Sequence, residues 1–211
     1  MRLAPGEADV WIVRLGDLRD ESLPPPTPEE AARAARFVNE TLCRRYLRSH
    51  GALRAVLALY TTAPLDFAAK EHGKPYLPGV PELRFNLSHS REAALIGVTL
   101  DAEIGVDVEK VRPMPDDVSV AERFFPPAEA AAFAAVPPPD RECDFFRRWT
   151  RIEAALKARG VGLYGIGEEP AGDWTIEEID ARFEAGAQYA AAVAVARGGV
   201  RVTIRHFEGD R

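Results

Sequence analysis

The sequence predicts an α+β fold made of two similar subdomains, each with a helix and a small antiparallel sheet. Two helical patterns are each followed by a series of strand patterns in the same order. The helices are predicted over residues 41–59 and 140–159. The strands are predicted over residues 83–87, 93–99, 103–109, 174–179, 188–195 and 200–207. This repeated architecture predicts subdomains 1–100 and 101–211, related by a pseudo-two-fold axis.

The first helix of the chain has a clear start signal. A strand over residues 10–15 comes first, and Thr27, Pro28 and Glu30 then form the pattern of a capping box with proline in the first turn. We therefore expect a helix from Thr27 to about residue 37.

Turn-forming residues mark the boundaries in the second half. Asp140 is placed to cap the helix over 140–159, and Gly160 is placed to end it. Gly198 and Gly199 predict a hairpin turn between the last two strands.

Composition narrows the class of protein. With 211 residues and 46% hydrophobic residues, the chain can bury the core of one large domain or two small ones. A formal net charge of −6 argues against a nucleic-acid-binding protein. The longest apolar run, 189–196, is shorter than the roughly 20 residues of a membrane span. No apolar leader follows Met1, so we expect a cytoplasmic protein with free thiols at Cys43 and Cys143.

Three acidic residues predict a divalent-cation site. Asp107 and Glu109 lie two apart in a strand pattern, so they share one face while the alternate apolar residues face a core. Glu153 lies on the later helix. A cation such as Mg²⁺ would remove the repulsion between carboxylates that lie so close together. The alternative is a charged, solvent-exposed strand edge.

Several basic residues are candidates for binding an anion. Trp149, Glu153 and Lys157 are spaced to share one helix face, although an exposed Glu-Lys pair has the same spacing. His89 follows a strand pattern between two serines, where it could bind phosphate or stabilise a turn. Lys74 lies between Gly73 and Pro75, in a stiff segment that would hold its ammonium group in place.

Four sequence blocks in this order resemble the 4'-phosphopantetheinyl transferases, and specifically their monomeric surfactin-type branch. The blocks are Gly73-Lys74-Pro75-Tyr76, Phe85-Asn86-Leu87-Ser88-His89-Ser90, Gly105-Val106-Asp107-Val108-Glu109-Lys110 and Trp149-Thr150-Arg151-Ile152-Glu153-Ala154-Ala155-Leu156-Lys157. The resemblance runs from about Thr27 to Gly162 and continues more loosely through the last strands.

This resemblance implies a reaction and a set of site residues. The enzyme would transfer the 4'-phosphopantetheine arm of coenzyme A to a serine of an acyl or peptidyl carrier protein, releasing 3',5'-adenosine bisphosphate. Asp107, Glu109 and Glu153 would hold Mg²⁺, with Mn²⁺ as an alternative. Glu153 and Lys157 would be catalytic, with Glu153 deprotonating the acceptor serine. Coenzyme A would contact Arg33, Arg45, Lys74, Ser88, His89 and Lys157.

The chain departs from the family pattern at two positions. Ile152 stands where the block Trp-x-x-Lys-Glu-Ala has its lysine, and Glu30 stands where a lysine is common. Binding of the 3'-phosphate would then be weaker, or would depend on Arg33, Arg36 and Arg45 instead. These departures leave open a coenzyme A-binding or carrier-docking protein with weak or lost transferase activity.

A different metal-dependent phosphotransferase acting on nucleotides ranks lower, because no glycine loop of the Gly-x-x-x-x-Gly-Lys-Ser/Thr type is present. For the carrier, Arg123, Phe124 and Phe125 are candidates for docking, with a core position for both phenylalanines as the alternative. Two fused halves predict a monomer, and the carrier's pathway (fatty acid, polyketide or nonribosomal peptide) is left open.

Overall fold

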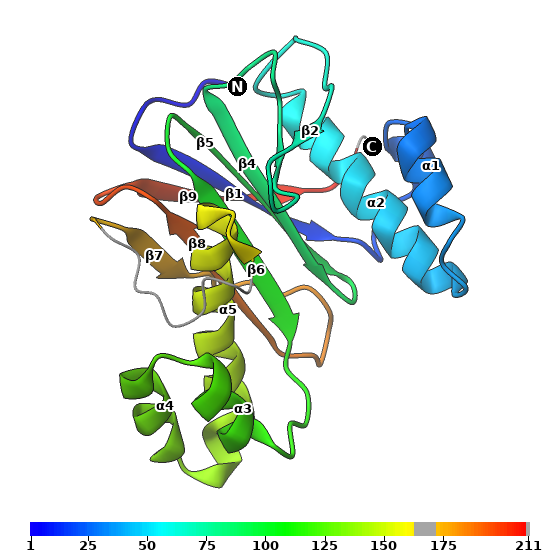
Figure 1. Cartoon of the computed structure of the whole chain (residues 1–211). Coiled ribbons are helices and arrows are strands. Elements are labelled where there is room, and N and C mark those ends of the chain that lie inside the picture. Colours follow the sequence, from blue (N-terminus) through cyan, green and yellow to red (C-terminus); the bar gives the residue numbers. More distant parts are fainter. Residues whose placement is uncertain (163–171, 210–211) are drawn as a thin grey trace.

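The computed structural model describes residues 1–162 and 172–209, and it confirms the α+β class (Figure 1). The strands are β1 (Glu7–Arg14), β2 (Ala68–Ala69), β3 (Pro75–Tyr76), β4 (Leu83–Ser90), β5 (Ala93–Leu100), β6 (Ile104–Lys110), β7 (Thr175–Glu178), β8 (Tyr189–Val195) and β9 (Arg201–Phe207). The α-helices are α1 (Pro28–Ala34), α2 (Glu40–Leu57), α3 (Asp117–Phe124), α4 (Pro127–Ala134) and α5 (Arg141–Arg159).

The larger sheet has the order β4-β5-β1-β9. Its first three strands are antiparallel, as predicted, but β1 and β9 run parallel. The hairpin predicted at Gly198-Gly199 is therefore wrong, because β8 and β9 lie in different sheets. Charged side chains add contacts across this pairing: Arg201 forms an ion pair with Glu7 of β1, and Arg205 lies 2.9 Å from the buried Asp9 carboxylate.

The smaller sheet has the antiparallel order β6-β8-β7. One of its faces shares a core with the larger sheet, in which Ile104, Val106 and Val108 pack with residues of β1 and β5. Each sheet carries a long helix on its other face: α2 on the larger sheet and α5 on the smaller one. Since β9 completes the larger sheet, the division at residue 100 and the pseudo-two-fold axis remain predictions.

The helix signals in the sequence are mostly confirmed. Thr27 and Glu30 form the capping box of α1, which ends at Ala34, three residues earlier than predicted. Gly160 ends α5 in the left-handed conformation, with φ of 69°. Helices α3 and α4 were not predicted; they pack with the first half of α5 around buried aromatic rings. No helix in the described part of the chain is long and apolar enough to cross a membrane.

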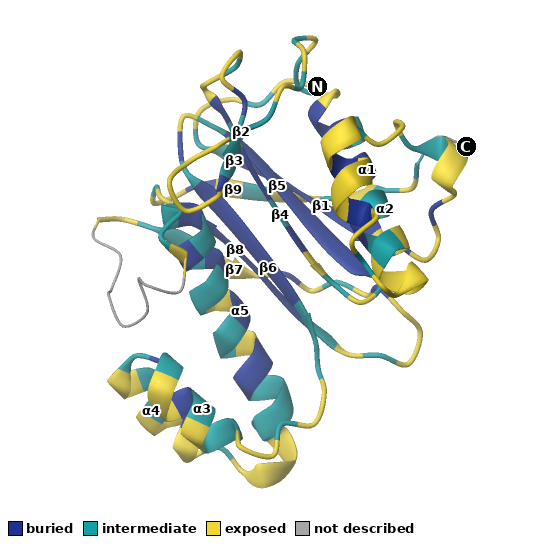
Figure 2. Ribbon diagram, turned by 45° about the vertical axis from the view of Figure 1, so that its right-hand side comes forward, coloured by how far each residue is buried: buried dark blue, intermediate teal, exposed yellow. Residues whose placement is uncertain are grey.

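Figure 2 shows the buried residues concentrated in the strands and along the inner faces of α2 and α5. Helix α5 comes very close to the backbone of β6 at Gly105. A Cβ atom there would lie 2.0 Å from the carbonyl oxygen of Ala154 and 2.4 Å from the amide nitrogen of Ala158. Both neighbours are backbone atoms of α5, so they cannot rotate away. Gly105 thus fixes how closely α5 approaches β6.

Lys74 ties the segment before β4 to the second half of the chain. Its Nζ donates to Glu103 Oε2 at 2.6 Å, to the Ile104 carbonyl at 3.0 Å and to the Ala158 carbonyl at 2.7 Å. The side chain is buried, and burial lowers the pKa of its ammonium group. The hydrogen bond and the negative charge of Glu103 raise this pKa and so offset part of the shift. Because an ammonium group has three protons, these bonds use its whole donor capacity.

Substituting Gly105 by alanine should destabilise the fold by about 3 kcal/mol or more, because the added methyl meets helix backbone. Gly79→Ala is the matched control. A Cβ at Gly79 has no atom within 4 Å, so its effect should stay within about 0.5 kcal/mol. Urea unfolding of both variants measures the difference, and equal stabilities would show that α5 can shift freely on β6.

Lys74→Met should lower the free energy of unfolding by about 2–4 kcal/mol, because two buried carbonyls lose their donor. Lys70→Met provides the comparison: Lys70 bonds the same Glu103 at 2.5 Å but is 40% exposed, so its loss should cost about 1 kcal/mol or less. Thermal and urea unfolding of the two variants measures both losses. If Lys74→Met lost no more unfolding free energy than Lys70→Met, the structural role of Lys74 would be contradicted.

Candidate active site

Side chains, rather than a backbone ladder, connect β4 to β6. Asn86 Oδ1 accepts from the Val106 amide at 2.9 Å, and Ser88 Oγ donates to Asp107 Oδ1 at 2.8 Å. Further along, Ser90 Oγ donates to Glu109 Oε2 at 2.8 Å. Residues 86, 88 and 90 point to one side of β4 because strand side chains alternate. We call these side-chain bonds of Asn86, Ser88 and Ser90 to β6 the seam. The seam places the predicted acids of β6 beside the serines of β4.

Lys157 of α5 reaches the seam and forms hydrogen bonds with two of its residues. Its Nζ donates to Asp107 Oδ1 at 2.5 Å and to Ser88 Oγ at 3.0 Å. Asp107 is 3% exposed, whereas the Lys157 side chain is 31% exposed. The ammonium group therefore neutralises a buried carboxylate while keeping access to the surface. The structure thus brings Ser88, Asp107 and Lys157 into direct contact.

Glu153 lies one helical turn before Lys157, in the same electrostatic neighbourhood. Burial raises the pKa of its carboxyl above the ordinary value, and the negative charges of Asp107 and Glu109 act in the same direction. Lys157 opposes the shift. The surroundings of Glu153 therefore favour the protonated form of its carboxyl.

The acids were also expected to hold a metal ion. Across residues 1–162 and 172–209, no three histidine, cysteine or acidic side chains gather closely enough to hold one. Asp107 Oδ2 is buried and has no hydrogen-bond partner, so one carboxylate oxygen remains free for a further ligand. Carboxylate oxygens are the donors that Mg²⁺ prefers, and the chemistry of the acids therefore fits such an ion.

Two of the predicted coenzyme A contacts lie near this cluster. His89 is exposed, and surrounding protein atoms lower its pKa, as do the positive charges of His50, Lys157 and Arg45. Arg45 itself is held by Glu92: its Nε lies 2.8 Å and its Nη2 2.5 Å from Glu92 Oε1. His89 and Arg45 thus belong to one positively charged neighbourhood.

The other predicted contacts have different surroundings. Arg33 is exposed on α1, with its guanidinium carbon 5.9 Å from the centre of the Tyr46 ring. Lys74 donates all its protons to internal acceptors, as described above. Its side chain supports the end of α5, next to Lys157, through the Ala158 carbonyl. In this arrangement Lys74 positions the site without offering it a free proton.

The two departures from the family pattern both have a structural basis. Glu30 is buried, completes the capping box of α1 and forms an ion pair with Arg54, which also donates to the carbonyls of Pro24 and Pro25 at 2.9 Å. Ile152 is partly buried against the aromatic core of α3, α4 and α5. Glu30 thus anchors the segment before α1, and Ile152 contributes to packing.

The predicted docking residues Arg123, Phe124 and Phe125 divide between surface and core. Phe125 is buried among other phenylalanines. Phe124 is half-buried with its ring edge against Trp149, and the Arg123 guanidinium carbon lies 5.2 Å from the centre of the Phe124 ring. Only Arg123 and part of Phe124 therefore remain available to a partner.

Sequence reasoning missed the roles of Asn86 and Ser90. We expected residues 88–91 to form the turn between two strands, but β4 continues to Ser90 and the turn falls at Arg91 and Glu92. The alternation of polar residues at 86, 88 and 90 was the available signal, since it places three hydrogen-bonding side chains on one side of a strand.

Comparisons with known proteins find relatives of this chain in one family. The 4'-phosphopantetheinyl transferase superfamily matches residues 103–194, which include the acids of β6 and all of α5. The transferase HetI of Nostoc is 38% identical over 146 residues, which cover 66% of this chain and 62% of HetI. The transferase AcpT of Escherichia coli is 33% identical over 159 residues, or 74% of this chain and 75% of AcpT.

The transferase Sfp of Bacillus subtilis is 28% identical over 141 residues, or 65% of this chain and 61% of Sfp. Several matches, including that to HetI, span about three fifths of the relative's length. The segment that the family model matches contains β6 and α5, and AcpT is matched over three quarters of its length. The chain belongs to the 4'-phosphopantetheinyl transferase superfamily.

Proposed function

We propose that this chain transfers 4'-phosphopantetheine from coenzyme A to a serine hydroxyl of an acyl or peptidyl carrier protein. The contact of Ser88 and Lys157 with the buried Asp107 carboxylate carries this proposal. It places a cation and a hydroxyl beside a carboxylate that has one oxygen free. We further propose that the protein is of the surfactin type, monomeric and cytoplasmic.

Asp107, Glu109 and Glu153 would hold a Mg²⁺ ion, with Mn²⁺ as an alternative. Such an ion would neutralise the charge of the coenzyme A pyrophosphate. Lys157 would bind the phosphate oxygens and spread the negative charge that grows on the leaving group, and His89 would donate a hydrogen bond to these oxygens. Arg45, together with Arg33 from α1, would bind the 3'-phosphate. For this, Arg45 would have to give up at least one of its two hydrogen bonds to Glu92.

Glu153 would act as the general base. Its carboxylate would take the proton of the acceptor serine, the serine oxygen would form a bond to the β-phosphorus, and the bond to the departing 3',5'-adenosine bisphosphate would break. The raised pKa of Glu153 makes it a stronger base at neutral pH than an ordinary carboxylate.

A second candidate is a protein that binds coenzyme A or a carrier with weak or absent transfer. The apolar contacts of Ile152 favour it, because an isoleucine can neither bind phosphate nor move a proton. Coenzyme A binding in a calorimetric titration, without mass gain on any carrier, would favour this candidate.

Glu153→Gln should reduce transfer by about 10²- to 10⁴-fold, because the amide cannot take a proton. The assay is intact-mass analysis of an apo acyl carrier protein incubated with coenzyme A and Mg²⁺. Glu177→Gln, an exposed position on β7, is the matched control and should transfer at the wild-type rate. Full activity of Glu153→Gln would remove Glu153 from the mechanism.

Ile152→Lys should raise kcat by about tenfold or more if the family's lysine assists proton transfer. Ile152→Met keeps the side chain apolar and similar in size, so it should leave kcat unchanged. Thermal unfolding establishes that both variants are folded. A folded Ile152→Lys protein with wild-type kcat would mean that this chain works without the lysine.

A further inference from the structure

The Glu103 carboxylate binds three basic side chains from the segments before it. Lys70 Nζ donates to Glu103 Oε1 at 2.5 Å, and Lys74 Nζ donates to Oε2 at 2.6 Å. Arg84 Nε lies 3.6 Å from Oε1. Burial alone would raise the pKa of this carboxyl, but the hydrogen bonds and charges of both lysines outweigh burial and lower the pKa. Glu103 is therefore ionised at neutral pH and holds the three cations together.

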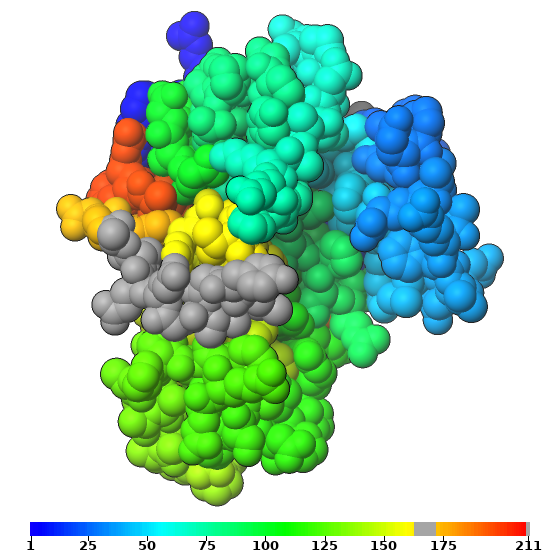
Figure 3. All heavy atoms as spheres, viewed as in Figure 1, coloured from blue at the N-terminus to red at the C-terminus, as the bar shows by residue number. Residues whose placement is uncertain are grey.

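The main chain of Glu103 belongs to the smaller sheet. Glu103 directly precedes β6, and its carbonyl accepts at 2.9 Å from the amide of Ala196, which directly follows β8. The two lysines lie instead in the segment of residues 68–76, which contains β2 and β3. Figure 3 shows this turquoise segment on the surface beside the yellow atoms at the end of α5. Glu103 thus attaches the segment to the sheet on which α5 packs.

Lys74 extends this attachment to the last turn of α5. Its side chain is 6% exposed, against 40% for Lys70 and 29% for Arg84. Its ammonium group also donates to the Ala158 carbonyl at 2.7 Å. The last four carbonyls of a helix have no partner within the helix, and a cation there is attracted to the negative end of the helix dipole. Lys74 therefore caps α5, while Glu103 holds the capping group in place.

The capped turn is the one that carries Lys157. Ala158 directly follows Lys157 in the chain, and Lys157 Nζ lies 2.5 Å from Asp107 Oδ1. A shift of the Ala158 carbonyl would therefore shift the backbone from which the Lys157 side chain extends. Misplacing a catalytic group by about 1 Å can slow a reaction by about 10²-fold. The position of Lys157 thus depends on Lys74 and, through it, on Glu103.

We infer that Glu103 is a positioning residue of the transfer reaction: through Lys74 it sets the position of the last turn of α5, and thereby that of Lys157. This inference rests on the proposed function, which assigns Lys157 to the phosphate oxygens. Lys74 then acts on coenzyme A only through Lys157, whereas the family resemblance implies a direct contact.

These two roles of Lys74 predict different kinetics. If Lys74 positions Lys157, loss of Glu103 slows the chemical step, because Lys157 stabilises charge that grows in the transition state. If Lys74 contacts coenzyme A directly, loss of Glu103 frees one of its protons for a phosphate oxygen and lowers KM for coenzyme A. A change in kcat or a change in KM therefore separates the two roles.

The test begins with Glu103→Gln, which keeps the size of the side chain and removes its charge. At saturating apo acyl carrier protein, kcat should fall about tenfold or more, with KM for coenzyme A within about twofold of wild type. Lys74→Met should show the same change. The double variant should be no slower than Lys74→Met, because the two residues act in series. Coenzyme A titration gives the fraction of each variant that is folded and binds, and kcat is corrected by this fraction.

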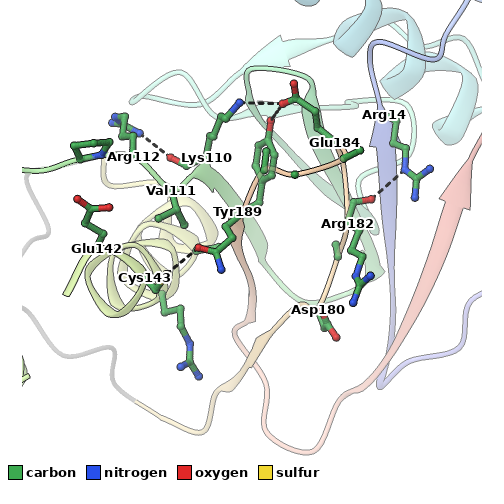
Figure 4. Close-up of a pocket in the computed structure, with 18 residues that line it drawn as sticks. Arg14, Lys110, Val111, Arg112, Glu142, Cys143, Asp180, Arg182, Glu184 and Tyr189 are labelled. Carbon is green, nitrogen blue, oxygen red and sulfur yellow. Dashed lines mark hydrogen bonds and ion pairs between the residues drawn. The ribbon is translucent and has the colours of Figure 1, made fainter. Parts of the chain in front are cut away.

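Glu184→Gln is the matched control. Glu184 Oε2 accepts from Lys110 Nζ at 3.0 Å, so this residue is also a glutamate paired with a lysine, but at the opposite end of β6. Figure 4 shows the pair on the wall of a cavity of about 1260 Å³. The kcat of Glu184→Gln at saturating carrier and its KM for coenzyme A should both match wild type.

Three results would overturn the positioning role and leave the proposed function intact. The first is a lowered KM for coenzyme A in Glu103→Gln with wild-type kcat. The second is wild-type kcat and KM in Glu103→Gln. The third is a double variant in which the two losses of kcat multiply, since Glu103 would then act on the rate without Lys74.

A wild type that transfers no phosphopantetheine to any carrier overturns the proposed function instead. Urea unfolding of the same variants then tests the pair by itself. A Glu103→Gln substitution that destabilises the wild type more than it destabilises the Lys74→Met protein supports the placement of α5 through Lys74. Equal losses in both backgrounds overturn it.

Discussion

The side-chain seam between β4 and β6 is the constraint on which the site depends. In an ordinary sheet the backbone would fill this edge with its own hydrogen bonds. Here Asn86, Ser88 and Ser90 bridge the strands, so two carboxylates of β6 come to lie against hydroxyl groups instead of backbone. Lys157 then balances the buried charge of Asp107. These hydrogen bonds join the two sheets and also organise the polar groups of the site.

Local sequence signals predicted much of this structure. The capping box at Thr27, the end of α5 at Gly160 and the alternation around Asp107 are each determined by a few neighbouring residues, so they can be recognised without the fold. The partner of β9, the pairing of Glu30 with Arg54 and the internal bonds of Lys74 depend on residues far apart in the chain. A single sequence contains no direct record of such contacts, which is why the hairpin prediction was wrong.

At the two positions that differ from the family pattern, Glu30 and Ile152, the side chain stabilises the fold instead of being available to bind an anion. A lysine at position 30 could bind an anion. The glutamate there instead caps the start of α1 and pairs with Arg54, which holds the Pro24 and Pro25 carbonyls. Position 152 likewise contributes apolar surface to the aromatic core of α3, α4 and α5. In the proposed mechanism, binding of the substrate therefore falls to the groups that remain polar, which are clustered around the seam.

The parallel pairing of β1 with β9 has a consequence for how the chain folds. Residues 7–13 find their partners at residues 201–207, so one edge of the larger sheet stays open until residues 201–207 have been synthesised. Strand pairing over such a distance is slow, and an uncovered edge can pair with another molecule. Its apolar residues would also be exposed during that time. The nascent protein thus passes through a stage in which chaperone protection matters more than it does for a fold whose sheets close locally.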